Sequence, residues 1–281
     1  MQEAFDVAPD APFLNPDLLR WKYFDAEPRS YVLDQGGKLL AHGCIWPVAP
    51  GMGCLIDWVS GKSIPGMGMM LARKMVQLSP VLLSIGGSEM TRKIMPKIGF
   101  VKRGELLTYA RVLRPWRQFR TRPDNHGPKA LLRLARNFLW SQAPVALTRG
   151  WMAEEAPAPE YLMRCPGLRL KAYRLRRGSL REGSLLLTQV GGQTRIADLT
   201  CSAEPSAYAA VSEAARRDPE ACELVALGHD GPSRRALEAN GFQERERRSV
   251  FVHGSTDFPP HLNMLADDLF YMNTPTRPYF T

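Results

Sequence analysis

A glycine-containing loop that leads directly into a helical pattern is the stretch of this sequence best suited to bind a ligand. It covers residues 60–68, reads SGKSIPGMG, and follows an apolar run that begins at Cys54. Glycines let the backbone approach a ligand and adopt dihedral angles that other residues disfavour. The first N–H groups of a helix lack intrahelical partners and carry positive potential, so a phosphate is their natural ligand. Lys62 would add a positive charge, although the same pattern is also typical of a structural turn.

The cysteine, histidine and acidic residues indicate neither a metal centre nor a cysteine nucleophile. The five cysteines lack CxxC spacing and are typical of reduced, mostly buried thiols: Cys44, Cys54, Cys165, Cys201 and Cys222. No sequence neighbour would activate the thiol of Cys44 or Cys54, so we expect no acyl-cysteine. No group of His, Asp or Glu has the spacing of metal ligands, and we expect no metal cofactor.

Length and composition are those of a globular protein with one large domain or two smaller ones. The 281 residues are 44% apolar and 23% charged, which excludes wholesale disorder. Apolar runs such as Pro80–Ile85 are far shorter than the roughly 20 residues of a membrane-spanning helix. Met1–Asp10 has no basic region followed by an apolar stretch, so it does not resemble a secretory signal. We therefore expect a cytoplasmic protein without a transmembrane segment.

The net charge of +9 is concentrated in one segment. Ten basic residues and two acidic residues lie between Val101 and Trp140. The basic stripe Arg111–Arg136 is compatible with nucleic acid, an anionic membrane surface or a phosphorylated ligand, and equally with a solvated linker. Nucleic acid is not the partner that we expect first.

The chain contains one pattern twice. Leu82–Phe100 aligns with Leu224–Phe242 without a gap, at an offset of 142, and five of the 19 positions are identical: Leu82/Leu224, Gly86/Gly228, Arg92/Arg234, Gly99/Gly241 and Phe100/Phe242. About one identity is expected from average residue usage. Two copies of one structural unit explain this repeat.

Hydrophobic periodicity predicts the same order of elements in both units. In the first unit we expect strands at 30–34, 39–48, 54–60, 81–85 and 105–113, and helices at 67–79 and 88–97. In the second unit we expect strands at 170–175, 184–190, 194–200, 223–227 and 248–253, and helices at 205–217 and 232–240. Ser88 is a plausible N-cap and Gly99 a plausible stop for the second helix, which Pro96 interrupts.

A linker with an amphipathic helix separates the units. Residues 128–142 carry an apolar face of Leu131, Leu132, Leu134, Ala135, Phe138 and Leu139. We expect this helix to pack between the two units, with a membrane-surface position as the alternative. The predicted organisation is a first unit at 1–122, a basic linker at 123–155 and a second unit at 156–281. The fold class is α+β, with a mixed central sheet flanked by helices in each unit.

The order hairpin, strand, glycine loop, helix, strand, helix, Gly-Phe, strand resembles the GNAT N-acetyltransferase superfamily, and the resemblance recurs in both halves. It implies that the loop Ser63–Gly68 holds the pyrophosphate of acetyl-CoA or a related acyl-CoA, chiefly through Gly66, Met67 and Gly68. Ser63 stands where the family usually has Gln or Arg, so one side-chain contact is missing. Trp58 and Val59 match the strand end that pairs with the pantetheine arm.

The chain departs from the family pattern at two places. The family's frequent acid, a Tyr four residues before the Gly of Gly-Phe, falls on Met95, and on Leu237 in the second unit. Neither side chain can donate a proton, and Tyr109 is a weaker alternative acid. The second unit also lacks the glycine loop, because Cys201–Pro205 leads directly into its helix. We therefore expect the first unit to bind the cofactor and the second to supply the acceptor cleft or mechanical support.

Acyl transfer to an amine or hydroxyl benefits from a base that takes the acceptor's proton. The candidates are Asp57 first, then His42, then Glu89, each with an ordinary structural role as the alternative. The resemblance thus implies an acyltransferase whose acceptor lies between the units. Separately, we expect Met264–Thr281 to cover or line that cleft. Two other interpretations remain: a FemABX-like transferase that uses aminoacyl-tRNA, and a degenerate, non-catalytic GNAT pair.

Overall fold

The structure, a computed structural model, describes residues 14–25, 29–61, 64–228, 231–254 and 279–281. Within them one continuous sheet has the strand order β1-β2-β3-β4-β11-β5-β10-β9-β8-β7-β6. The strands are β1 (Ser30–Gln35), β2 (Lys38–Ala49), β3 (Met52–Ser60), β4 (Val81–Ile85), β5 (Val101–Val112), β6 (Trp151–Ala156), β7 (Arg169–Arg177), β8 (Leu180–Val190), β9 (Gln193–Thr200), β10 (Glu223–Gly228) and β11 (Gln243–His253). The helices are α2 (Pro16–Phe24), α3 (Met67–Met75), α4 (Glu89–Ile94), the 3₁₀ helix η2 (Met95–Ile98), α5 (Pro115–Thr121), α6 (Gly127–Ser141), α7 (Glu160–Met163), α8 (Pro205–Arg216) and α9 (Pro232–Glu238).

The elements expected from periodicity are present in both units, with their ends shifted by a few residues. The β1–β2 turn contains Gly36 and Gly37 at φ +61° and +84°, the two positive angles that a tight hairpin turn requires. The Ser88 side chain caps α4 by accepting a hydrogen bond from the Thr91 backbone N–H at 3.1 Å. Pro96 converts the rest of the predicted helix into η2, because its ring cannot continue an α-helix. The fold class, two α+β units, is confirmed.

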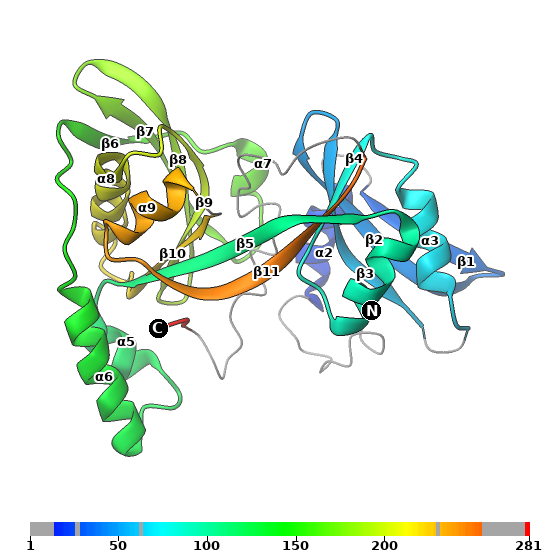
Figure 1. Ribbon diagram of the computed structural model, residues 1–281, viewed down its shortest axis with the longest axis horizontal. Helices are drawn as coiled ribbons and strands as arrows, with labels where there is room; N and C mark the ends of the chain where they lie inside the picture. Colours follow the sequence, from blue (N-terminus) through cyan, green and yellow to red (C-terminus); the bar gives the residue numbers. More distant parts are fainter. Residues whose placement is uncertain (1–13, 26–28, 62–63, 229–230, 255–278) are drawn as a thin grey trace.

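The two units exchange their last strands. β5 follows β4 in the chain, yet it pairs with β10, from Glu223↔Val112 to Gly228↔Leu107. β11 in turn pairs with β4, from Val250↔Ile85 to His253↔Leu82. Figure 1 shows β5 and β11 side by side, running from one half of the molecule to the other. The two sheets therefore merge, and each unit is completed by a strand of the other.

Buried apolar side chains form a cluster on the helix side of each unit and a third cluster on the opposite side of the sheet. This third cluster contains residues of both units, among them Trp21 and Leu162. The Trp21 and Tyr161 rings stack with centroids 4.9 Å apart, and Trp21 Nε1 donates to the Tyr161 carbonyl at 2.8 Å. These residues belong to α2 and α7, two helices that periodicity did not reveal, and they tie the two units together.

The helix expected at 128–142 exists as α6, but its expected packing is wrong. α6 packs on α5 and β5, and Figure 1 shows α5 and α6 at the outer end of the second half of the molecule, not between the halves. Its buried side chains are Ala130, Leu134 and Asn137. Most of the apolar face predicted to pack against the units is instead exposed.

Candidate functional site

Helix α3 begins with an uncapped first turn. Gly66 is its N-cap at φ +88°, no side chain caps the first turn, and that turn contains no acidic residue. Gly66 is exposed, and a Cβ there would meet nothing within 4 Å, so only the backbone conformation requires glycine. The N–H groups at this end can therefore receive an anion from solvent. Lys62 and Ser63 lie outside the described residues.

Gly68 lies where the first turn of α3 comes close to strand β3. A Cβ at Gly68 would be 3.1 Å from Ser60 Oγ and 3.5 Å from Trp58 Nε1. The indole Nε1 of Trp58 donates to the Gly68 carbonyl at 2.8 Å. Trp58, expected to hold the pantetheine arm, thus fixes the first turn of α3 to β3.

The β3–β4 ladder ends early. Only Met52, Gly53 and Cys54 pair with β4, although β3 continues to Ser60. Among the described strands, none pairs with the β3 edge that faces away from β2 from residue 55 to residue 60. Trp58 and Val59 lie in this stretch, which ends beside the first turn of α3. An extended ligand would find backbone hydrogen-bonding groups here.

Asp57 lies at an irregularity of the β2–β3 pairing. The register shifts between His42 and Cys44, which face Val59 and Ile56. Asp57 is the extra residue of β3 at this bulge. Its φ is +50°, an angle that is uncommon for residues other than glycine. Such a bulge re-aims the side chains next to it.

The Asp57 carboxylate is buried in an ion pair that the sequence analysis did not foresee. Oδ2 lies 2.6 Å from Lys22 Nζ and accepts a hydrogen bond from the Tyr23 hydroxyl at 2.8 Å. The Lys22 and Asp57 side chains are only 3% and 6% exposed. Neutralising Asp57 would leave the Lys22 ammonium buried without its counter-charge. Asp57 is therefore better suited to hold α2 on β3 than to exchange protons.

His42 lies beside this pair, and its hydrogen bonds define which nitrogen carries the proton. Nδ1 is 3.1 Å from the Asp57 carbonyl oxygen, which can only accept, so Nδ1 is the donor. Nε2, 2.9 Å from Ser30 Oγ, then accepts from that hydroxyl. The His42 ring also contacts the Tyr23 ring edge-on, with centroids 5.1 Å apart.

Burial lowers the pKa of His42 below 6.5, with the hydrogen bond to the Asp57 carbonyl partly opposing the shift. The imidazole is therefore neutral at pH 7, and its unprotonated nitrogen, Nε2, can accept a proton. Of the three expected bases, the structure brings together Asp57 and His42. It places Glu89 elsewhere, exposed in the first turn of α4 and paired with Lys93 at 2.6 Å.

The positions that aligned with the family's acid are core positions. Met95 and Leu237 are both fully buried, in the helix-side clusters of the first and second unit. Tyr109 is also buried, in the cluster of the second unit. Tyr23 is instead the phenol in contact with the His42–Asp57 pair.

Sequence analysis missed Lys22 and Tyr23 because it assigned no helix before residue 30. The signals were present: Asn15 accepts from the Asp17 and Leu18 N–H groups, and Pro16 occupies the first helical position. Asn followed by Pro is a recognisable helix start. What the sequence did not show is that α2 lies against β3.

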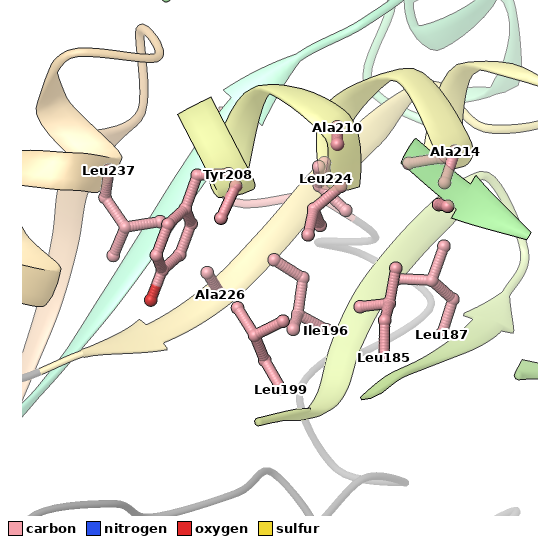
Figure 2. Packing of buried hydrophobic residues seen from close by; sticks show 14 of the residues in the cluster. Leu185, Leu187, Ile196, Leu199, Tyr208, Ala210, Ala214, Leu224, Ala226 and Leu237 are labelled. Carbon is pink, nitrogen blue, oxygen red and sulfur yellow. The ribbon is translucent and has the colours of Figure 1, made fainter. Parts of the chain in front are cut away.

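In the second unit, buried side chains occupy the region around the start of the corresponding helix, α8. Tyr208 lies in the first turn of α8, the helix that corresponds to α3, and its side chain is buried. Figure 2 shows Tyr208 among Leu237, Ala226 and Leu199. The β9–β10 ladder also has only three pairs, but apolar side chains pack beside it.

The start of α8 also differs chemically from the start of α3. Its N-cap is Glu204 and its first residue is Pro205. Glu204 carries a negative charge, and proline has no N–H group. An anion is therefore disfavoured at α8, as the missing glycine loop predicts.

The thiols and acidic groups of the described residues are arranged as in an ordinary folded core. All five cysteines are thiols, and all but Cys201 are buried. Burial raises the pKa of Cys165 and of Cys201 to about 12, which disfavours the nucleophilic thiolate. Within the described ranges no group of three or more His, Cys, Asp or Glu side chains is placed to hold a metal ion, and no helix there is long and apolar enough to cross a membrane.

Comparison with known proteins identifies the fold. No protein-family model and no curated protein matches the sequence. Among solved structures, the chain is similar to a GCN5-related N-acetyltransferase from Anabaena variabilis ATCC 29413 (TM-score 0.56, 9% identity, 89% of this chain and 67% of that one). It is also similar to a putative acetyltransferase from Pyrococcus horikoshii (TM-score 0.54, 12% identity, 91% and 83%). A third match is a tandem GNAT protein from the clavulanic acid biosynthesis pathway (TM-score 0.50, 12% identity, 86% and 89%).

The chain therefore has the fold of the GNAT N-acetyltransferase superfamily. The tandem match covers most of both chains, in agreement with the repeat found in the sequence. Identities of 9–12% establish the fold and leave the chemistry to be argued from this chain's own residues.

Proposed function

We propose that this protein is an acyltransferase that moves an acetyl or other acyl group from acyl-CoA to an amine or hydroxyl, and that only its first unit binds the donor. The observation that carries the proposal is the start of α3 at the exposed, uncapped Gly66, beside a strand whose ladder to β4 has ended. The fold shared with acetyltransferases supports it.

The residues present fit an acyl-CoA. The first turn of α3 offers N–H groups and positive potential to the pyrophosphate, with no acidic side chain there to repel it. The edge of β3 at Trp58 and Val59 offers backbone groups to the amide-containing arm. When bound, acyl-CoA would supply the thioester that the acceptor attacks.

His42 is the residue that we assign as the base. The attacking amine or hydroxyl forms a bond to the acyl carbon as the carbon–sulfur bond breaks and the CoA thiolate leaves. The acceptor proton passes to His42 Nε2 by way of the Ser30 hydroxyl, 2.9 Å away. Asp57 positions this base through its carbonyl oxygen, and Lys22 and Tyr23 hold Asp57 in place. The acceptor would enter from the α2 side of the sheet.

A non-catalytic acyl-CoA-binding role is the second candidate. It is favoured by the apolar core residue Met95 at the family's acid position. The two candidates share the binding site and differ in turnover.

Donor binding is tested by measuring the midpoint of thermal unfolding in the presence of acetyl-CoA. Free CoA and ATP serve as phosphate-containing controls. Ligand at about 100 times its dissociation constant stabilises the folded state by roughly 2.7 kcal/mol, a rise of several degrees at about 2–4 °C per kcal/mol. We expect such a rise with CoA species and its loss in Gly66→Asp. The matched control is Gly37→Asp, at φ +84° and also with open space around it. No rise with any CoA species, or equal rises in both variants, would contradict the proposal.

A further inference from the structure

Helices α5 and α6 present an apolar surface that nothing in the described structure covers. Its members are the exposed side chains of Trp116, Leu131, Leu132, Phe138 and Leu139, hereafter the α5–α6 surface. Leu132 and Leu139 are 71% and 76% exposed, and they lie seven residues apart, on one face of the helix. The opposite face of α6 packs against the protein through Ala130, Leu134 and Asn137.

Aromatic contacts join the two helices into one surface. The Trp116 and Phe138 rings meet edge to face, with centroids 5.9 Å apart. Trp116 is itself 56% exposed. A tryptophan beside exposed leucines is typical of helices that lie in a membrane interface.

The charges around this surface are positive. Arg120, Lys129 and Arg136 are exposed on the same two helices. The acidic residue of this segment, Asp124, is already held by Arg133 at 2.7 Å. An apolar stripe bordered by cations complements an anionic lipid surface, in which acyl chains receive the leucines and headgroups meet the cations.

Other basic residues of the segment are buried or already have protein partners, and Arg117 lies 3.7 Å from Glu220. Arg111 is buried, Arg114 donates to the carbonyls of Ala221 and Arg216, and Arg122 binds the Thr281 carbonyl. The stripe is therefore not a continuous track for a nucleic-acid backbone, and exposed leucines have no function there. A second copy of the chain would bring like charges together.

From this geometry we propose that the α5–α6 surface binds this protein peripherally to anionic membranes, with α6 lying in the plane of the interface. Figure 1 shows α6 at the end of the molecule far from α3, so the membrane would leave the start of α3 accessible. The proposal rests on α5 and α6 alone and is independent of the function proposed above.

The test is co-sedimentation of the full-length protein with vesicles of phosphatidylcholine and phosphatidylglycerol at 7:3, compared with phosphatidylcholine alone. We expect binding to the anionic vesicles, and at least a tenfold lower partition coefficient for Leu132→Glu/Leu139→Glu. The control is Leu39→Glu/Leu180→Glu, which makes the same change of charge at leucines 67% and 65% exposed on β2 and β8.

Other outcomes would overturn the proposal. They are absence of wild-type binding to the anionic vesicles, or equal loss in both double variants. A dimer in light scattering that only Leu132→Glu/Leu139→Glu dissociates, without vesicle binding, would assign the surface to a second copy. Retention on RNA without vesicle binding would assign it to nucleic acid. Lys129→Gln/Arg136→Gln provides a variant that leaves the apolar side chains intact, and it should weaken binding to anionic vesicles only.

Discussion

The two units have the same element order and the same early end of a parallel ladder, yet they differ where the ligand of the first unit would bind. In the first unit a glycine precedes the helix, and its first turn has neither a side-chain cap nor an acidic residue. In the second, the corresponding helix begins with a glutamate as its N-cap and a proline as its first residue, and its first turn carries a buried tyrosine. The fold tolerates both arrangements because the sheet and the exchanged strands do not depend on that turn. The start of α3 can therefore accept an anion, whereas the start of α8 is occupied by the protein's own side chains.

The largest expected effect concerns His42, the base that we propose for the first unit. His42→Ala should lower kcat by about 10²–10⁴-fold, the usual contribution of a general base, and leave acetyl-CoA binding unchanged. The measurement is thiol release from acetyl-CoA with a primary-amine acceptor found by screening. An unchanged kcat would favour another base, and absence of turnover in the wild type with every acceptor would favour the non-catalytic candidate.

The buried ion pair beneath this base should contribute strongly to stability. Lys22→Met leaves the Asp57 carboxylate buried without its partner and should cost about 3–5 kcal/mol in urea unfolding. The double variant Lys22→Met/Asp57→Asn removes both charges and should recover most of that loss. A cost below about 1 kcal/mol for the single variant would mean that the pair is exposed to water in solution.

The buried cluster around Tyr208 in the second unit should matter for stability and not for ligand binding. Leu237→Ala removes a fully buried side chain beside Tyr208 and should cost about 2–5 kcal/mol. The dissociation constant for acetyl-CoA, measured well below the unfolding temperature, should not change. A tenfold weaker dissociation constant would show that the second unit contributes directly to the donor site.

The smallest effect is the dependence on pH. Because the pKa of His42 is lowered below 6.5 on folding, its neutral form stabilises the protein above pH 6.5. This contribution decreases as the pH falls from 6.5 through the lowered pKa. Any turnover that depends on His42 as a base should decrease over the same pH range, because protonated imidazole cannot accept a proton. Titration of the His42 ring by NMR checks the direction, and a value above 6.5 would contradict it.

Sequence patterns predicted the repeat, the order of strands and helices and the asymmetry of the glycine loop, because these depend on local periodicity and on glycine and proline chemistry. They did not predict the strand exchange, since β5 and β11 have similar patterns and either fits beside β4. They misjudged which face of α6 is buried, because an apolar face was assumed to pack.

The candidate site was only partly predictable from the sequence. Asp57 and His42 were selected and lie together, because neighbouring antiparallel strands carry them. Lys22 and Tyr23 come from a helix far away in sequence, and only tertiary packing places them there. Of the segment expected to line the acceptor cleft, the structure describes Tyr279–Thr281, which contact α5 and Glu223 instead.

The stoichiometry of acetyl-CoA binding, measured by isothermal titration calorimetry, tests most directly the claim that the start of α3 can accept an anion and the start of α8 cannot. The account predicts one site per chain in the wild type and in Gly37→Asp, and none in Gly66→Asp. Two sites per chain, or one site that persists in Gly66→Asp, would contradict it.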